Sequence, residues 1–122
     1  MNRSVCNFIA ILNQAIKKKA YSFRCSYFSL AFPILDALVR EGFLQYYTRK
    51  GEILQVVLRC NKNGPILSGV TSKSKPSKRV FVRWRELKPK NTIKLLLCGS
   101  HVLTATEAFN QKRGGIVILE IV

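Results

Sequence analysis

Apolar residues of the first forty positions recur at helical spacing. In the first such segment they lie three or four positions apart, on one face of a helix: Val5, Phe8, Ile9, Leu12 and Ile16. This pattern predicts an amphipathic helix over 4–19, with Ser4 as its N-cap and three lysines at its end. A second helix is predicted over 29–41, ended by Gly42, which can adopt the left-handed conformation.

Alternating apolar and polar positions predict strands elsewhere. Residues 21–26 are predicted to form one short, half-buried strand, with Tyr21 on its inward side. Residues 43–48 and 53–60 are predicted to form a hairpin with a glycine in its turn. Two later segments, 93–97 and 116–122, are apolar enough to be buried strands. Between these two, Thr104 and Glu107 match a capping box, which predicts a short helix to about residue 112, ended by the glycine pair 114–115.

The order of these elements predicts an α+β fold with two small subdomains. The N-terminal subdomain, residues 1–70, has the order α-β-α-β-β. Residues 71–77 are rich in serine and lysine and contain a proline, which is typical of a linker. Residues 78–122 then form a C-terminal subdomain that is mostly β, with one short helix.

The charge balance narrows the function. The chain of 122 residues has 21 lysines and arginines against 6 acidic residues, a formal net charge of +15, while 48% of its residues are hydrophobic and can form a core. Such an excess of one charge favours a polyanionic partner, with nucleic acid as the first candidate and an anionic membrane surface as the second. The longest uncharged stretch runs only from residue 4 to residue 16, too short to cross a bilayer, and no secretory signal or leader is recognisable, so we expect no membrane partner.

Metal and catalytic chemistry have little support in the sequence. The four cysteines are widely spaced and His101 is the only histidine, so we expect free, buried thiols and no metal. The six carboxylates form no close pair for acid–base work. Ser100 and His101 are the one hydroxyl–imidazole pair, but adjacent residues seldom aim at each other productively. We therefore expect no enzyme activity, no cofactor and no small-molecule substrate.

The densest basic window is 73–90, where Glu86 is the only acidic residue. A strand over 79–85 would place Val80, Val82 and Trp84 on one face, inward. The opposite, exposed face would carry guanidinium groups for phosphates and a ring for stacking on bases: Arg79, Phe81, Arg83 and Arg85. That combination suits RNA, in which unstacked bases are read together with the backbone.

Four ordered segments resemble the family of small-subunit ribosomal protein eight. They are the opening helix 5–16, Leu-Val-Arg-Glu-Gly-Phe-Leu at 38–44, Ser-Lys-Pro-Ser-Lys-Arg-Val-Phe at 74–81, and the closing stretch 102–115. The resemblance implies a two-domain protein that binds a helical element in the central domain of small-subunit ribosomal RNA and contacts neighbouring small-subunit proteins. It implies binding mostly through the C-terminal subdomain.

The resemblance and the basic window together predict the RNA-binding residues, in three groups: Lys75, Lys78, Arg79, Phe81, Arg83 and Arg85; Cys98, Gly99, Ser100 and His101; and Lys112, Arg113, Gly114 and Gly115. The family's loop usually reads Ser-Thr-Ser-basic-Gly where this chain has residues 97–101, and Phe81 stands where tyrosine is usual. We therefore expect backbone amides, stacking and charge to carry more of the contact. The same departures suggest a fast-evolving mitochondrial copy, with a plastid or bacterial protein as the alternative. A free-standing RNA-binding regulator or assembly factor outside the ribosome is the alternative function.

Overall fold

The computed structural model describes residues 3–67, 69–72, 81–86, 93–99 and 101–121. Four of the predicted site residues lie outside these ranges: Lys75, Lys78, Arg79 and Ser100. The side chain of Trp84, predicted to face inward, also lies outside the description, as does all of Val80.

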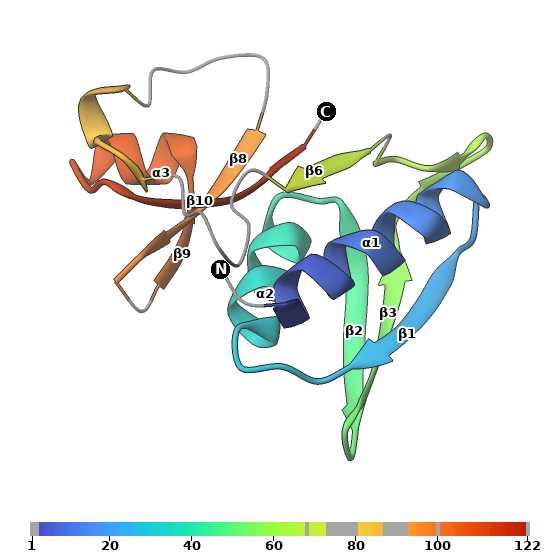
Figure 1. Cartoon of the computed structure of the whole chain (residues 1–122). Helices are drawn as coiled ribbons and strands as arrows, with labels where there is room; N and C mark the ends of the chain where they lie inside the picture. The colour runs from blue at the N-terminus through green and yellow to red at the C-terminus, as the bar shows by residue number, and fades with distance from the viewer. Residues whose placement is uncertain (1–2, 68, 73–80, 87–92, 100, 122) are drawn as a thin grey trace.

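The N-terminal part is a three-stranded antiparallel sheet with two helices on one face (Figure 1). Its elements follow in this order: α1 (Arg3–Lys17), β1 (Ser22–Ser26), α2 (Ala31–Arg40), β2 (Leu44–Lys50) and β3 (Ile53–Leu58). The strand order is β1-β3-β2. Gly51, with a φ of +63°, closes the hairpin between β2 and β3. This part confirms the predicted α-β-α-β-β order, and Gly42, with a φ of +83°, follows α2 as predicted.

The C-terminal part is a second antiparallel sheet, with the order β6-β10-β8-β9 and with β7 also paired to β10. Its elements are β6 (Val70–Ser72), β7 (Phe81–Val82), the 3₁₀ helix η1 (Trp84–Glu86), β8 (Ile93–Cys98), β9 (His101–Thr104), α3 (Ala105–Asn110) and β10 (Gly115–Ile121). A two-stranded ribbon, β4 (Cys60–Asn61) and β5 (Gly64–Pro65), lies between the two sheets in the chain. The mostly β composition with one short helix is confirmed, and so is the capping box at Thr104 and Glu107.

The core is continuous across both parts. The apolar face of α1 is buried as predicted, and its Phe8 belongs to the same cluster as Leu95 of β8 and Ile118 of β10. On the other face of the C-terminal sheet, Leu96 and Val117 pack in a smaller cluster against α3. Burial on both faces explains why β8 and β10 are apolar runs rather than alternating ones.

Two polar contacts also join the parts. The side-chain amide of Asn13 donates a hydrogen bond to the carbonyl of Val70 (2.6 Å) and accepts one from its N–H (2.9 Å). The guanidinium of Arg40 on α2 forms a salt bridge of 3.0 Å with Glu107 on α3. The two parts thus share a core and are also linked by polar side chains.

Several predicted boundaries are wrong. Helix α1 already includes Arg3, so Ser4 lies inside its first turn and is not the N-cap. Strand β1 begins at Ser22, and the side chain of Tyr21 is 70% exposed instead of facing inward. Thr71 and Ser72, assigned to the linker, lie in β6, because their backbones pair with β10. The division into two domains remains a prediction.

Candidate nucleic-acid interface

The predicted strand over 79–85 is wrong beyond Val82. Strand β7 ends there and the chain continues in the 3₁₀ helix η1. The reason is the register: Val82 pairs with Gly115, the first residue of β10, so the next residue finds no strand to pair with. Arg83 and Arg85 therefore lie beyond the strand and not on one of its faces.

Phe81, Arg83 and Arg85 are nevertheless all exposed, and with Gly114 they line one open hollow. The ring of Phe81 is 66% exposed, unusual for so large an apolar group. The turn after β7, rather than strand alternation, brings the ring and the two guanidinium groups together.

The hairpin between β8 and β9 contributes the second predicted group. Cys98 pairs with His101 across a two-residue turn, in which Gly99 has a φ of +65° that glycine adopts without strain. Gly99 and His101 are exposed. The side chain of Cys98 is only 1% exposed, and burial raises the pKa of its thiol while the nearby charge of Arg113 lowers it. Cys98 is thus a packing residue, and a ligand cannot reach its thiol.

The turn between α3 and β10 contributes the third group. Lys112 has a φ of +55°, so it, and not the predicted glycine pair, makes the left-handed turn that ends α3. Arg113 donates a hydrogen bond from Nη2 to the carbonyl of Cys98 (2.9 Å) and thereby braces the β8–β9 hairpin. A Cβ on Gly115 would lie 2.5 Å from the carbonyl oxygen of Leu97, so only glycine fits there.

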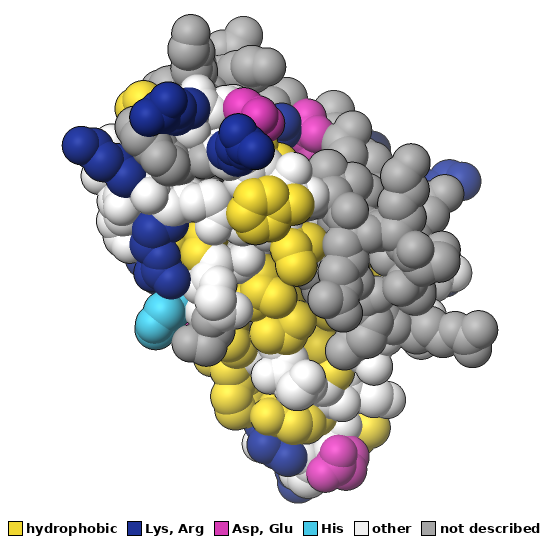
Figure 2. All heavy atoms as spheres, turned by 60° about the vertical axis from the view of Figure 1, so that its left-hand side comes forward, with side chains coloured by type: hydrophobic (Ala, Val, Ile, Leu, Met, Phe, Trp, Pro, Cys, Tyr) yellow, Lys and Arg dark blue, Asp and Glu magenta, His cyan; other side chains and the backbone are white. Residues whose placement is uncertain are grey.

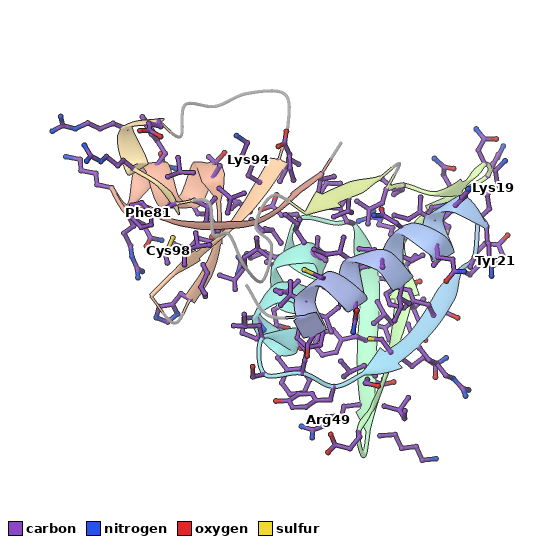
Figure 3. All side chains as sticks on the ribbon, in the orientation of Figure 1. Lys19, Tyr21, Arg49, Phe81, Lys94 and Cys98 are labelled. Carbon is purple, nitrogen blue, oxygen red and sulfur yellow. The ribbon has the colours of Figure 1, made fainter. Side chains whose placement is uncertain are left out.

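These segments meet at one end of the molecule. Figure 3 shows Phe81 and Cys98 at this end, with Lys19 and Tyr21 at the other. In Figure 2, which brings this end forward, lysine and arginine side chains gather beside the chain's single histidine, His101, next to a run of apolar side chains. The geometry offers positive charge, one exposed ring and accessible backbone at two turns, a combination suited to phosphates and unpaired bases.

Sequence reasoning did not anticipate the roles of Arg113 and Gly115. It named both as RNA contacts, which remain predictions; the structure adds that Arg113 holds the neighbouring hairpin and that Gly115 allows β10 to approach β8 closely. Each role depends on a partner more than ten positions away, so spacing along the chain carries no signal for it.

The described residues show neither a metal cluster nor a membrane span. No group of three or more His, Cys, Asp or Glu side chains among them could hold a metal ion. The four cysteines are free thiols, of which Cys25 and Cys98 are buried and Cys6 and Cys60 only half-buried, so the predicted burial holds for two. None of the helices described is long and apolar enough to span a membrane.

The chain is thus a small, strongly basic α+β protein, and its net charge of +15 favours a polyanionic partner. Comparison with known proteins gives its family. The model of the family "Ribosomal protein S8" matches residues 4–122, and the chain belongs to that family.

Curated relatives agree with this assignment. The small ribosomal subunit protein uS8 of Nitratidesulfovibrio vulgaris is 32% identical over 92 residues, which cover 72% of each chain. The protein of the same name from Caulobacter vibrioides is 26% identical over 129 residues, covering 99% of this chain and 98% of the relative. That from Geobacillus stearothermophilus is 32% identical over 97 residues, 73% of each chain.

Proposed function

We propose that the protein holds a helical element in the central domain of small-subunit ribosomal RNA with the C-terminal interface described above. As a member of the S8 family it is a structural protein of the small ribosomal subunit that binds ribosomal RNA. The proposal that the C-terminal interface holds this RNA rests on one observation. The segment β7–η1, the β8–β9 hairpin and the α3–β10 turn lie together at one end of the molecule.

Different residues would contribute different contacts. The guanidinium groups of Arg83 and Arg85 would pair with phosphates, and the ring of Phe81 would stack on an unpaired base. Gly99 and Gly114 have no side chain, so the RNA backbone could approach the main chain at both turns. The two turns are held by contacts within the protein: Arg113 donates a hydrogen bond to the carbonyl of Cys98, and Gly115 lies close to the main chain of β8. Lys75, Lys78, Arg79 and Ser100 remain proposed contacts on the strength of the sequence.

The proposed role is structural, without catalysis and without a cofactor. It includes contacts with neighbouring small-subunit proteins, as expected of a ribosomal component. The support is the character of the interface, where exposed arginines, one exposed ring and accessible main chain suit binding to RNA rather than turnover.

We also place the protein in the mitochondrion, on its ribosomes, with a plastid or the bacterial cytoplasm as alternatives. The support is the departure of residues 97–101 from the usual loop, together with identities of only 26–32% to the bacterial relatives. Sedimentation of fractionated lysates, probed for this chain, tests both place and function. Migration with mitochondrial small subunits is expected, while a pool at the top of the gradient that magnesium does not shift would favour a free-standing regulator.

A binding experiment tests the interface itself. The variants Phe81→Ala and Arg83→Ala should weaken binding to the central domain of small-subunit ribosomal RNA without unfolding the protein, since both side chains are exposed. The arginine variant should also lower the slope of log affinity against log salt by about 0.7–0.9. Arg24→Ala, an exposed arginine on β1, is the matched control. Equally weakened binding for the Arg24 and Arg83 variants would overturn the proposed location of the interface.

A further inference from the structure

A second basic hollow lies at the opposite end of the molecule. It is lined by residues of the turn after α1 and of the β4–β5 ribbon: Lys19, Tyr21, Lys62, Asn63 and Gly64. Figure 3 shows Lys19 and Tyr21 at this end, far from Phe81 and Cys98. The sequence pattern assigned Lys19 to the end of a helix and Tyr21 to the inward side of a short, half-buried strand.

The turn after α1 holds Tyr21 outward. Lys19 has a φ of +55°, and the N–H of Ala20 donates to the carbonyl of Ala15 (3.0 Å), so the helix closes before the strand starts. The carbonyl of Tyr21 then accepts a hydrogen bond from the N–H of Leu58 (2.8 Å). Its backbone is therefore fixed to the end of β3, while its ring is 70% exposed, more than Phe81.

The β4–β5 turn carries Lys62 and lies against the stem of Lys19. The side chain of Asn61 accepts a hydrogen bond from the N–H of Asn63 (2.8 Å), which shapes the turn. Gly64 has a φ of +117°, and a Cβ there would lie 3.4 Å from the stem of Lys19. The positive φ favours glycine at this position, and the stem of Lys19 lies against it, so the two turns are in contact.

The charge of this hollow is not neutralised from within the described part of the chain. None of its lining residues is acidic. The two salt bridges among the described residues lie elsewhere and join Arg40 to Glu107 and Arg49 to Glu52. A large aromatic ring exposed beside lysines that no acidic residue lines is an unusual surface for a protein alone, and it suits an anionic ligand with a flat apolar group. This set of groups matches an unpaired nucleotide: the ring can stack on the base, the lysines can pair with the phosphate, and the amide of Asn63 can hydrogen-bond to the edge of the base.

We propose that this hollow binds a single-stranded segment of RNA, with a base stacked on Tyr21 and phosphates paired with Lys19 and Lys62. It is a second contact, separate from the C-terminal interface, so the protein would hold two RNA segments at its two ends. This contact does not depend on which RNA element the C-terminal end holds.

A uridine dodecamer is the probe, because base–aromatic stacking tolerates any sequence. Its affinity for the full chain is measured over a range of salt concentrations, in wild type and in a Phe81→Ala background. In the Phe81→Ala background, which lacks the stacking ring of the C-terminal interface, Tyr21→Ala should weaken binding by about tenfold. Tyr21→Phe should bind as wild type does, because the ring is kept.

Matched controls separate the hollow from general charge. Tyr46→Ala removes another exposed tyrosine, 52% exposed on β2, and should leave the affinity of the dodecamer close to that of wild type. Lys19→Gln with Lys62→Gln should lower the log–log salt slope by about 1.4, since each phosphate of a single strand that is neutralised by a lysine adds about 0.7 to the slope. Lys50→Gln, an exposed lysine beyond the hollow, should not lower it.

Three results would overturn the proposal: unchanged affinity for Tyr21→Ala in the Phe81→Ala background, equally weakened binding for Tyr46→Ala in that background, or polyglutamate binding to the hollow as tightly as the dodecamer at the same salt. The last would show a general anion site. If Phe81→Ala and Arg83→Ala left binding to ribosomal RNA intact while Tyr21→Ala weakened dodecamer binding, the C-terminal interface would fail and this second contact would stand.

Discussion

The contact between Asn13 and Val70 allows a quantitative test of how the two parts of the chain are joined. One side-chain amide satisfies both backbone groups of Val70, at 2.6 and 2.9 Å, on the edge of β6 that faces α1. Val70 is only 5% exposed, so water has little access to these groups when the amide is removed. Asn13→Ala therefore removes two hydrogen bonds and leaves buried partners unpaired, a cost of about 2–3 kcal/mol.

That cost converts to a melting shift. With an unfolding entropy of roughly 2.1 cal/mol/K per residue, 122 residues give a fall in Tm of roughly 8–12 °C. Thermal unfolding followed by circular dichroism measures it. Asn110→Ala, at the exposed end of α3, is the control and should stay within about 0.5 kcal/mol of wild type. A Tm for Asn13→Ala that matches the control would refute the reasoning, since the amide would then add nothing to the junction.

Three further predictions concern packing, capping and ionisation. Gly115→Ala forces a Cβ to within 2.5 Å of the carbonyl oxygen of Leu97 and should cost about 1–3 kcal/mol in urea unfolding; an unchanged midpoint would contradict this steric argument. Glu107→Ala removes half of the capping box of α3 and should cost about 1–2 kcal/mol, whereas Glu107→Gln, which can still accept the hydrogen bond, should cost less. Burial, followed by the hydrogen bond to Asp36 and the negative charge of Asp36, raises the pKa of Tyr47 from 10.0 to about 12. The neutral phenol therefore stabilises the fold, and this contribution is fully present below pH 10. That stabilisation should disappear as the pH rises from 10.0 to about 12, and Tyr47→Phe should flatten urea-measured stability in this window; an unchanged slope would show that Tyr47 does not cause it.

The elements that the sequence predicted well depend on short-range physics. Helical spacing in α1 places Phe8 and Leu12 in the core because positions three and four apart share a face. The capping box is equally local, since Thr104 and Glu107 satisfy each other's backbone groups within one turn. The glycine of the β2–β3 hairpin acts at a single position, Gly51. Each of these features could be predicted without knowing the rest of the fold.

The predictions that failed depend on distant partners. Strand β7 stops at Val82 because β10 begins at Gly115, and nothing within 79–85 reveals where β10 begins. Likewise, β6 is a strand because Val70 and its neighbours pair with β10. The carbonyl of Val70 also accepts a hydrogen bond from the side-chain amide of Asn13. Tyr21 follows the alternation of its neighbours, but it lies just before the first residue of β1, where its ring is exposed although its carbonyl is hydrogen-bonded to Leu58 of β3.

The same limit applies to the basic residues themselves. The net charge of +15 indicates a polyanionic partner, but it does not say which cations meet it. Arg113 is hydrogen-bonded to the carbonyl of Cys98. The guanidinium carbon of Arg49 lies 3.7 Å from the ring centroid of Tyr27, so both arginines have partners within the protein. Lys19 differs from these two arginines, because it lines a hollow that has the exposed ring of Tyr21 and no acidic lining residue. The proposed second contact rests on this environment and not on density of charge along the chain, and the sequence window 73–90 therefore does not contain it.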